Sequence, residues 1–176
     1  MRPSAWVTRF GALVPSGGAV IDVACGSGRH LRWFAERGHP VVGVDRADAA
    51  VAACSNLGEV IQADIENGPW PFAGRCFAVV VVTNYLWRPL LPTLIASVAP
   101  GGMLIYETFA AGNEAIGKPS NPDFLLRPAE LLAACAELRV IAYENGFLSD
   151  PPRFVQRIAA VREPTQTAGE VVRWPL

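Results

Sequence analysis

The sequence predicts an α/β fold in three layers: a doubly wound, mostly parallel sheet with helices on both faces. Apolar runs of strand length alternate with helical patterns along the chain, as in consecutive βαβ units. Several of these runs are continuously apolar, such as 78–82 (AVVVV), which is typical of strands buried on both faces. The chain has 176 residues, 51% of them hydrophobic and 18% charged, enough for one domain with a sizeable core.

Seven strands are expected, joined mainly by crossover helices. The last two are separated only by a short loop that contains Asp150-Pro151-Pro152, and a connection this short permits antiparallel pairing but not a parallel crossover. One antiparallel strand is therefore expected near the end of the sheet. The expected strands are 19–24, 40–44, 59–63, 77–82, 103–109, 138–143 and 153–161.

Four helices are expected between the strands. In the first, Leu31 and Phe34 share one face at helical spacing, and Gly38 is placed to end the helix in a left-handed conformation. Pro128 suits the first position of the fourth helix. The expected helices are about 28–37, 47–55, 90–98 and 128–136.

Segment 110–127 is the irregular piece of the chain, because it is long and rich in Gly, Pro and Asn. Loops of this length inside a compact domain are usually functional or disordered. We expect a lid-like insertion here, within a single domain that spans 1–176 and has its core at about 18–162.

Composition argues against several kinds of partner. The formal net charge is −1 and no run of basic residues marks a nucleic-acid surface. No apolar run approaches the roughly 20 residues that a membrane helix needs, and the first residues lack the apolar core of a signal peptide. Four cysteines without C-x-x-C spacing are typical of reduced thiols. We expect a cytoplasmic protein without nucleic-acid or membrane partners and without a metal site; the oligomeric state stays open.

The most informative pattern is 20–30 (VIDVACGSGRH), followed at 41–45 by VVGVD. An apolar strand runs into a turn of small residues, a helix follows, and a second strand ends in a carboxylate. Gly26 and Gly28 allow the backbone to approach a ligand closely, and Asp45 can accept hydrogen bonds from ribose hydroxyls. The pattern predicts a nucleoside cofactor.

A dinucleotide is disfavoured, because the fingerprint G-x-G-x-x-G/A has Leu31 at its third glycine position. Three carboxylates, Asp22, Asp45 and Asp64, accompany the strand ends, and no basic residue is placed for a pyrophosphate. This arrangement suits a ligand with a ribose, an adenine and a positive or zwitterionic character.

Together these features resemble the class I S-adenosylmethionine-dependent methyltransferases, over about residues 18–162. The turn motif of that family reads acid-x-Gly-x-Gly-x-Gly, and 22–28 (DVACGSG) matches it except that Ala24 replaces the first glycine. The resemblance implies a Rossmann-like sheet of order 3-2-1-4-5-7-6 with strand seven antiparallel. Three further stretches are similar to small bacterial methyltransferases of the tellurite-resistance type: 106–109 (YETF), 112–114 (GNE) and 121–132 (NPDFLLRPAELL).

The resemblance also implies a set of cofactor residues. Asp45 would take the ribose hydroxyls, Asp64 and Ile65 would flank the adenine, and Asn84 would lie beside the methionine part. Structural alternatives stay open, since Asp45 could instead cap a helix and Asp64 could be a solvated loop acid. The full expected set is Asp22, Ala24, Gly26, Ser27, Gly28, His30, Asp45, Arg46, Asp64, Ile65 and Asn84.

On the acceptor side, we expect a small molecule, because the chain lacks the Asn/Asp-Pro-Pro-Tyr/Phe motif of enzymes that methylate exocyclic amines on nucleic acid. The expected acceptor residues follow the fourth and fifth strands, where ligands bind in such sheets. They are Tyr85, Arg88, Glu107 and Asn113.

No catalytic base is unambiguous. Tyr85, Glu107 and His30 are candidates, but His30 could be a structural donor at the turn, and Glu107 could be a charge satisfied by Arg127 or by the 110–127 loop. A thiolate nucleophile at Cys25 is disfavoured, since nothing near it in sequence would lower its pKa.

Two other functions remain possible from the sequence. The first is an NAD-dependent oxidoreductase, which Leu31 and the lack of a Tyr-x-x-x-Lys pair disfavour. The second is a non-catalytic module that binds S-adenosylmethionine, which the sequence cannot separate from an enzyme because it shows a cofactor site better than catalysis.

Overall fold

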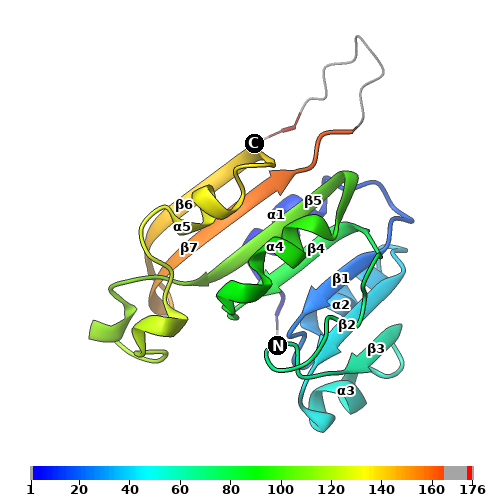
Figure 1. The fold of residues 1–176 in the computed structure, drawn as a ribbon, viewed down its shortest axis with the longest axis horizontal. Coiled ribbons are helices and arrows are strands. Elements are labelled where there is room, and N and C mark those ends of the chain that lie inside the picture. Colours follow the sequence, from blue (N-terminus) through cyan, green and yellow to red (C-terminus); the bar gives the residue numbers. More distant parts are fainter. Residues whose placement is uncertain (1, 165–173, 176) are drawn as a thin grey trace.

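The computed structural model describes residues 2–164 and 174–175. Its centre is a seven-stranded sheet of order β3-β2-β1-β4-β5-β7-β6 (Figure 1). β7 is antiparallel to both of its neighbours, and the other neighbouring strands are parallel. The expected fold class, strand order and antiparallel strand are thus confirmed. The strands are β1 Val20–Val23, β2 Val41–Asp45, β3 Glu59–Gln62, β4 Phe77–Thr83, β5 Val98–Phe109, β6 Arg139–Ser149 and β7 Pro152–Val161.

Helices cover both faces of the sheet, and each face has its own apolar core. One core contains Phe10, Phe34 and Cys54, contributed by α1, α2 and α3; the other contains Leu94 and Leu131, contributed by α4 and α5. β4 lies between these layers, and its residues 77–82 (FAVVVV) are all apolar because both of its faces are covered. The helices are α1 Ala5–Gly11, α2 Arg29–Ala35, α3 Asp48–Cys54, α4 Leu91–Ala96 and α5 Glu130–Ala134, with short 3-10 turns η1 Arg88–Leu90, η2 Asn113–Ala115 and η3 Pro122–Phe124.

β1 lies where the strand order reverses, with β2 on one side and β4 on the other. In open parallel sheets this reversal leaves a crevice at the carboxyl ends of the strands, where ligands bind. The turns that follow β1, β2, β3 and β4 therefore meet at one edge of the molecule.

The main element that sequence reasoning missed is α1. Ser4 caps it, because its hydroxyl accepts from the backbone N–H groups of Trp6 and Val7. Trp6, Val7 and Phe10 are buried against the sheet. Their spacing is that of an amphipathic helix, so the signal was present in the sequence.

Several boundaries differ from those expected. β5 begins at Val98, not at 103, so it includes residues 98–102, which were not expected to belong to a strand. Its pairing with β4 shifts register between Phe77 and Val79. β6 continues to Ser149 because its whole length pairs with β7. α5 begins at Glu130, not at Pro128, because Ala129 is left-handed with φ +60°. Gly38 has φ +80°, as the helix-end pattern predicts.

Segment 110–127 folds back on itself, and backbone pairing closes its base. Ala111 N donates to the carbonyl of Leu126 over 2.9 Å, and Leu126 N donates to the carbonyl of Phe109 over 2.9 Å. The segment contains η2 and η3, so it is an ordered loop that leaves β5 and returns to it.

In the part of the chain that the structure describes, no helix is long and apolar enough to cross a membrane. Met1, residues 165–173 and Leu176, which belong to the expected domain 1–176, lie outside the described residues.

Candidate active site

The turn after β1 is tied to the end of β2 by a single carboxylate. Asp45 Oδ2 accepts a hydrogen bond from Gly26 N over 2.9 Å, and its Oδ1 accepts from Ala47 N over 3.0 Å. Asp45 is therefore not the N-cap of α3, which is Ala47; it links the turn after β1 to the turn after β2 at the edge of the crevice. Its carboxylate is held against the glycine turn, where the sequence places the ribose.

The two glycines of the turn do different things. Both are left-handed, with φ +53° at Gly26 and φ +70° at Gly28. A Cβ on Gly26 would meet no heavy atom of the described residues within 4 Å, whereas a Cβ on Gly28 would lie 2.4 Å from Cys54 Sγ. Gly28 therefore lets α3 pack against the turn, and Gly26 leaves open space beside the backbone.

Ala24 occupies the position of the family's first glycine and has φ +55°. A left-handed conformation costs a residue with a Cβ about 1–2 kcal/mol. Despite this cost, Ala24 keeps the left-handed backbone that a glycine would adopt at this position.

Beneath the turn lies a buried pair of side chains, Asp22 and His30. His30 Nδ1 lies 3.4 Å from Asp22 Oδ2, and both side chains are almost fully buried. His30 Nε2 accepts from Ser4 N over 3.2 Å, so the ring proton is assigned to Nδ1, facing Asp22. Burial raises the pKa of Asp22, and the neighbouring His30 opposes that shift. His30 therefore connects β1, through Asp22, to the start of α1, through Ser4.

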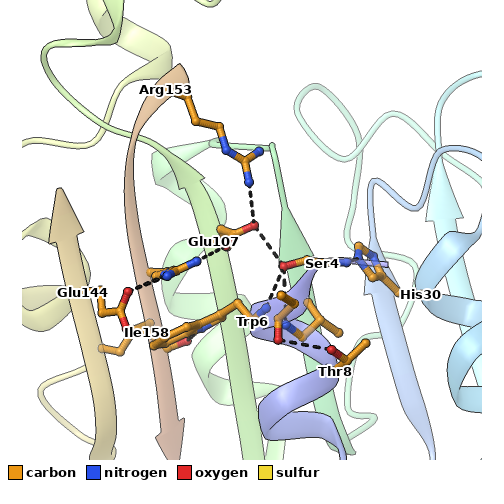
Figure 2. A network of polar contacts seen from close by, with 11 residues as sticks. Ser4, Trp6, Thr8, His30, Glu107, Glu144, Arg153 and Ile158 are labelled. Atoms are coloured by element: carbon orange, nitrogen blue, oxygen red, sulfur yellow. Dashed lines mark hydrogen bonds and ion pairs between the residues drawn. The ribbon is translucent and has the colours of Figure 1, made fainter. Parts of the chain in front are cut away.

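Glu107 belongs to the same buried network (Figure 2). It is 2% exposed. Ser4 Oγ donates to its Oε1 over 3.0 Å; Arg157 lies 3.1 Å from Oε2 and Arg153 lies 3.6 Å from Oε1. Both arginines come from β7, and Arg157 is the register partner of Glu107. The carboxylate thus ion-pairs with β7, not with Arg127 as the sequence alternative had it.

A first cavity of about 140 Å³ opens at the ends of β1, β2 and β3. It brings together five residues of the expected cofactor set and Tyr85 of the expected acceptor set. The Asp64 carboxylate at its rim is exposed and accepts from Asn67 Nδ2 over 2.9 Å and from the backbone of Glu66 and Asn67; these bonds lower its pKa. The lining residues are Ala24, Asp45, Arg46, Ala63, Asp64, Ile65, Glu66 and Tyr85.

A second cavity, of about 230 Å³, lies between the ends of β4 and β5 and the 110–127 loop. Glu66 and Tyr85 line both cavities, so the two adjoin there. Its residues are Glu66, Asn84, Tyr85, Leu86, Thr108, Phe109, Pro119 and Phe124. Of these, only Asn84 and Tyr85 were among the site residues expected from the sequence.

Tyr85 stands between the cavities with an unsatisfied hydroxyl. Its backbone carbonyl accepts from Tyr106 Oη over 2.8 Å, which fixes its position. Its own Oη is buried and has no hydrogen-bond partner among the described residues. Burial and the Glu66 carboxylate raise the pKa of Tyr85, so the phenol keeps its proton at neutral pH and is a donor, not a base.

Two expected acceptor residues support the loop instead of lining its cavity. Arg88 bonds Glu130 through Nε over 2.7 Å and donates to the carbonyls of Asp123 and Leu125, on either side of Phe124. Asn113 is 2% exposed and bonds the carbonyl of Pro119 and the N–H of Phe154. Arg88 and Asn113 therefore hold the two loop residues that line the second cavity.

Ser27 lies on neither of these cavities. It lines a third one, of about 580 Å³, together with Arg2, Arg29 and Trp33. Cys25 is buried, and burial raises the pKa of its thiol, which agrees with a packed cysteine and not with a nucleophile.

These residues fit S-adenosylmethionine as a ligand. The open space at Gly26 can receive a ligand pressed against the backbone. Asp45, Asp64 and Ile65, which the resemblance assigns to the ribose and the adenine, line the first cavity together. Tyr85, whose buried hydroxyl has no hydrogen-bond partner among the described residues, lines the same cavity.

Comparison with known proteins agrees with this assignment. A family model described as "Methyltransferase domain" matches residues 20–102. A malonyl-[acyl-carrier protein] O-methyltransferase of Serratia marcescens is 31% identical over 106 residues, which is 55% of this chain and 40% of that protein. The aligned part thus spans less than half of the length of this curated relative.

Solved structures share the fold. TehB from Haemophilus influenzae has a TM-score of 0.73 at 17% identity, over 92% of this chain and 63% of the other. The glycopeptide N-methyltransferase MtfA complexed with (S)-adenosyl-L-homocysteine has a TM-score of 0.64 at 17% identity, over 92% and 90%. Residues 20–102 thus match a methyltransferase domain, and with the strand order and the glycine turn in agreement the chain is similar to the class I S-adenosylmethionine-dependent methyltransferases.

Proposed function

We propose that this protein transfers the methyl group of S-adenosylmethionine to a small-molecule acceptor held in the second cavity. The observation that carries the proposal is the junction of the two cavities: Glu66 and Tyr85 line both. A cofactor in the first cavity and an acceptor in the second would meet at this junction.

The residues of this chain act mainly by positioning. Gly26, Asp45, Asp64 and Ile65 would hold the nucleoside. The bound cofactor supplies a methyl group on a sulfonium, which is already activated. Alignment of acceptor, methyl and sulfur is therefore the main task, and good alignment is worth roughly 7–11 kcal/mol in favourable cases.

The 110–127 loop supports this function by covering the second cavity. Pro119 and Phe124 bring apolar surface to its wall, and a cover of this kind excludes water from the transfer. The cavity volume, about 230 Å³, is below the roughly 300–1,000 Å³ usual for ligand pockets, which favours a small acceptor. The expected cytoplasmic location stays a prediction from the cysteine pattern.

Two measurements test the proposal. Calorimetry with S-adenosylmethionine, S-adenosylhomocysteine and NAD comes first; binding of NAD at micromolar concentration, with no heat from the other two, would assign the site to an oxidoreductase. A screen of small acceptors with isotopically labelled methyl donor, read by mass spectrometry, comes second. Tight cofactor binding without transfer to any compound would indicate a non-catalytic binding module.

A further inference from the structure

The charged side chain that lines the second cavity is acidic. Among the described residues that line it, Glu66 is the one ionisable side chain besides Tyr85, and none is Lys, Arg or His. Its neighbour, the first cavity, adds Asp45 and Asp64 against the single guanidinium of Arg46. Three carboxylates and one cation thus surround the junction, so an anion entering the second cavity would be repelled and a cation attracted.

The nearby arginines are engaged with other groups, and Arg29 donates to Thr83 Oγ1 over 3.3 Å at the end of β4. Arg88 donates hydrogen bonds to the Glu130 carboxylate and to two loop carbonyls. Arg153 and Arg157 are paired with the buried carboxylate of Glu107. The phenol of Tyr85 is uncharged at neutral pH because burial and Glu66 raise its pKa.

The walls of this cavity are aromatic. Tyr85, Phe109 and Phe124 line it on three segments, the end of β4, the end of β5 and the loop. Aromatic faces attract cations, by about 0.5–2 kcal/mol according to exposure, and they pack against apolar bodies. Aromatic rings beside a carboxylate therefore suit an organic ammonium group.

We propose that the acceptor is an organic amine with a small apolar or aromatic body, and that Glu66 binds its nitrogen. This inference rests on the proposed function. The ammonium would give a proton to Glu66 or to water beside it. The freed nitrogen lone pair then forms the N–C bond to the methyl carbon while the C–S bond breaks and its electron pair stays on sulfur. The positive charge passes from sulfur to nitrogen, so atoms and charge balance.

The test uses the full chain saturated with S-adenosylhomocysteine, so that binding is measured without reaction. Calorimetry compares three matched series: propylamine, propanol and propionate; benzylamine, benzyl alcohol and benzoate; and 2-phenylethylamine, 2-phenylethanol and phenylacetate. Selenite is the inorganic oxyanion probe. We expect the amine to bind more tightly than its alcohol in at least one series, by at least about tenfold, the effect of a charge-assisted hydrogen bond.

Glu66→Gln is the diagnostic variant, because it removes the charge and keeps the shape. It should reduce the preference for amine over alcohol to within about threefold and leave the binding of the alcohol unchanged. Glu137→Gln is the matched control: Glu137 is an exposed acid beyond α5, and its variant should keep the full preference. In activity assays, the wild type should yield the N-methylated amine, identified by mass spectrometry.

The outcomes separate the two proposals. Failure of S-adenosylhomocysteine to bind would overturn the proposed function. If S-adenosylhomocysteine binds, two results would overturn the amine assignment alone. One is tightest binding by the carboxylates or selenite; the other is no preference for the amine in any series. Retention of the amine preference in Glu66→Gln would overturn the role of Glu66.

Discussion

Asp45 is the carboxylate that we expect the cofactor to contact most directly. Asp45→Ala should weaken S-adenosylhomocysteine binding by about 2 kcal/mol or more, because hydrogen bonds to a charged group are worth roughly 1.5–3 kcal/mol each. The fold should survive, since the side chain lies at the end of a strand. The variant loses two hydrogen bonds to backbone N–H groups, and both are local to the adjacent turns. Calorimetry on the folded variant measures the change. An unchanged dissociation constant would assign Asp45 to the turn alone.

The two glycines of the turn give a matched pair at the same scale. Gly26→Ala and Gly28→Ala place a Cβ on left-handed backbone, at a cost of about 1–2 kcal/mol each. Only the second also meets Cys54 Sγ at 2.4 Å, which adds about 1–3 kcal/mol of overpacking. Gly28→Ala should therefore be the less stable variant in urea unfolding, whereas Gly26→Ala should stay folded and lose S-adenosylhomocysteine binding. Equal stabilities, or unimpaired binding by Gly26→Ala, would contradict this division of roles.

At the scale of elements, Ser4 links the start of α1 to the buried polar network beside the sheet. Ser4 caps α1, donates to Glu107 and gives its N–H to His30 (Figure 2). Ser4→Ala removes the cap and the bond to a buried carboxylate, so it should lower the free energy of unfolding by about 1–3 kcal/mol. Thr8→Ala on the same helix removes an exposed hydroxyl bond and should cost less than about 0.5 kcal/mol. Similar losses in both variants would show that Ser4 does not anchor the helix.

The Arg88–Glu130 pair fixes the loop element, and its effect should depend on pH. Burial raises the pKa of Glu130, but Arg88 and the N–H of Arg127 outweigh it, so the pKa lies below the usual 4.5. A depressed carboxyl pKa stabilises the fold above the unfolded pKa, and this stability is lost as pH falls through the folded pKa. Glu130→Gln should therefore cost about 1 kcal/mol at pH 7, with a difference from wild type that shrinks as the pH falls below about 4.5.

Urea unfolding across pH 3–7 measures this difference. Glu59→Gln is the matched control, because Glu59 makes a similar pair with Arg75 on the exposed surface, and its loss should be smaller. A penalty for Glu130→Gln that does not change with pH would show that the carboxylate charge is not the cause.

Some parts of the fold and of the candidate site could be predicted from the sequence and others could not, for physical reasons. The central strands follow from their runs of buried apolar residues, and the turn at Gly26 follows from its small residues and the acids around it. The partners of Glu107 could not be predicted, because Arg157 meets it through the antiparallel register of β7, which no local pattern reveals. Glu66 was missed because it follows a strand that is only half-buried and faces a cavity built by three other segments.

The whole molecule joins its two cores through one sheet, so ligand binding at the strand ends should stabilise all of it. A ligand that binds only the folded state adds about 2.7 kcal/mol at a hundredfold excess over its dissociation constant. For a chain of this size that amounts to a rise in Tm of about 5–10 °C. We expect such a rise with S-adenosylhomocysteine in thermal unfolding, growing with ligand concentration. NAD should give none, and Asp45→Ala should largely lose the response while Glu137→Gln keeps it. An equal shift with NAD would mean that the crevice recognises adenosine in general, and that Asp45, Asp64 and Ile65 do not by themselves select the methyl donor.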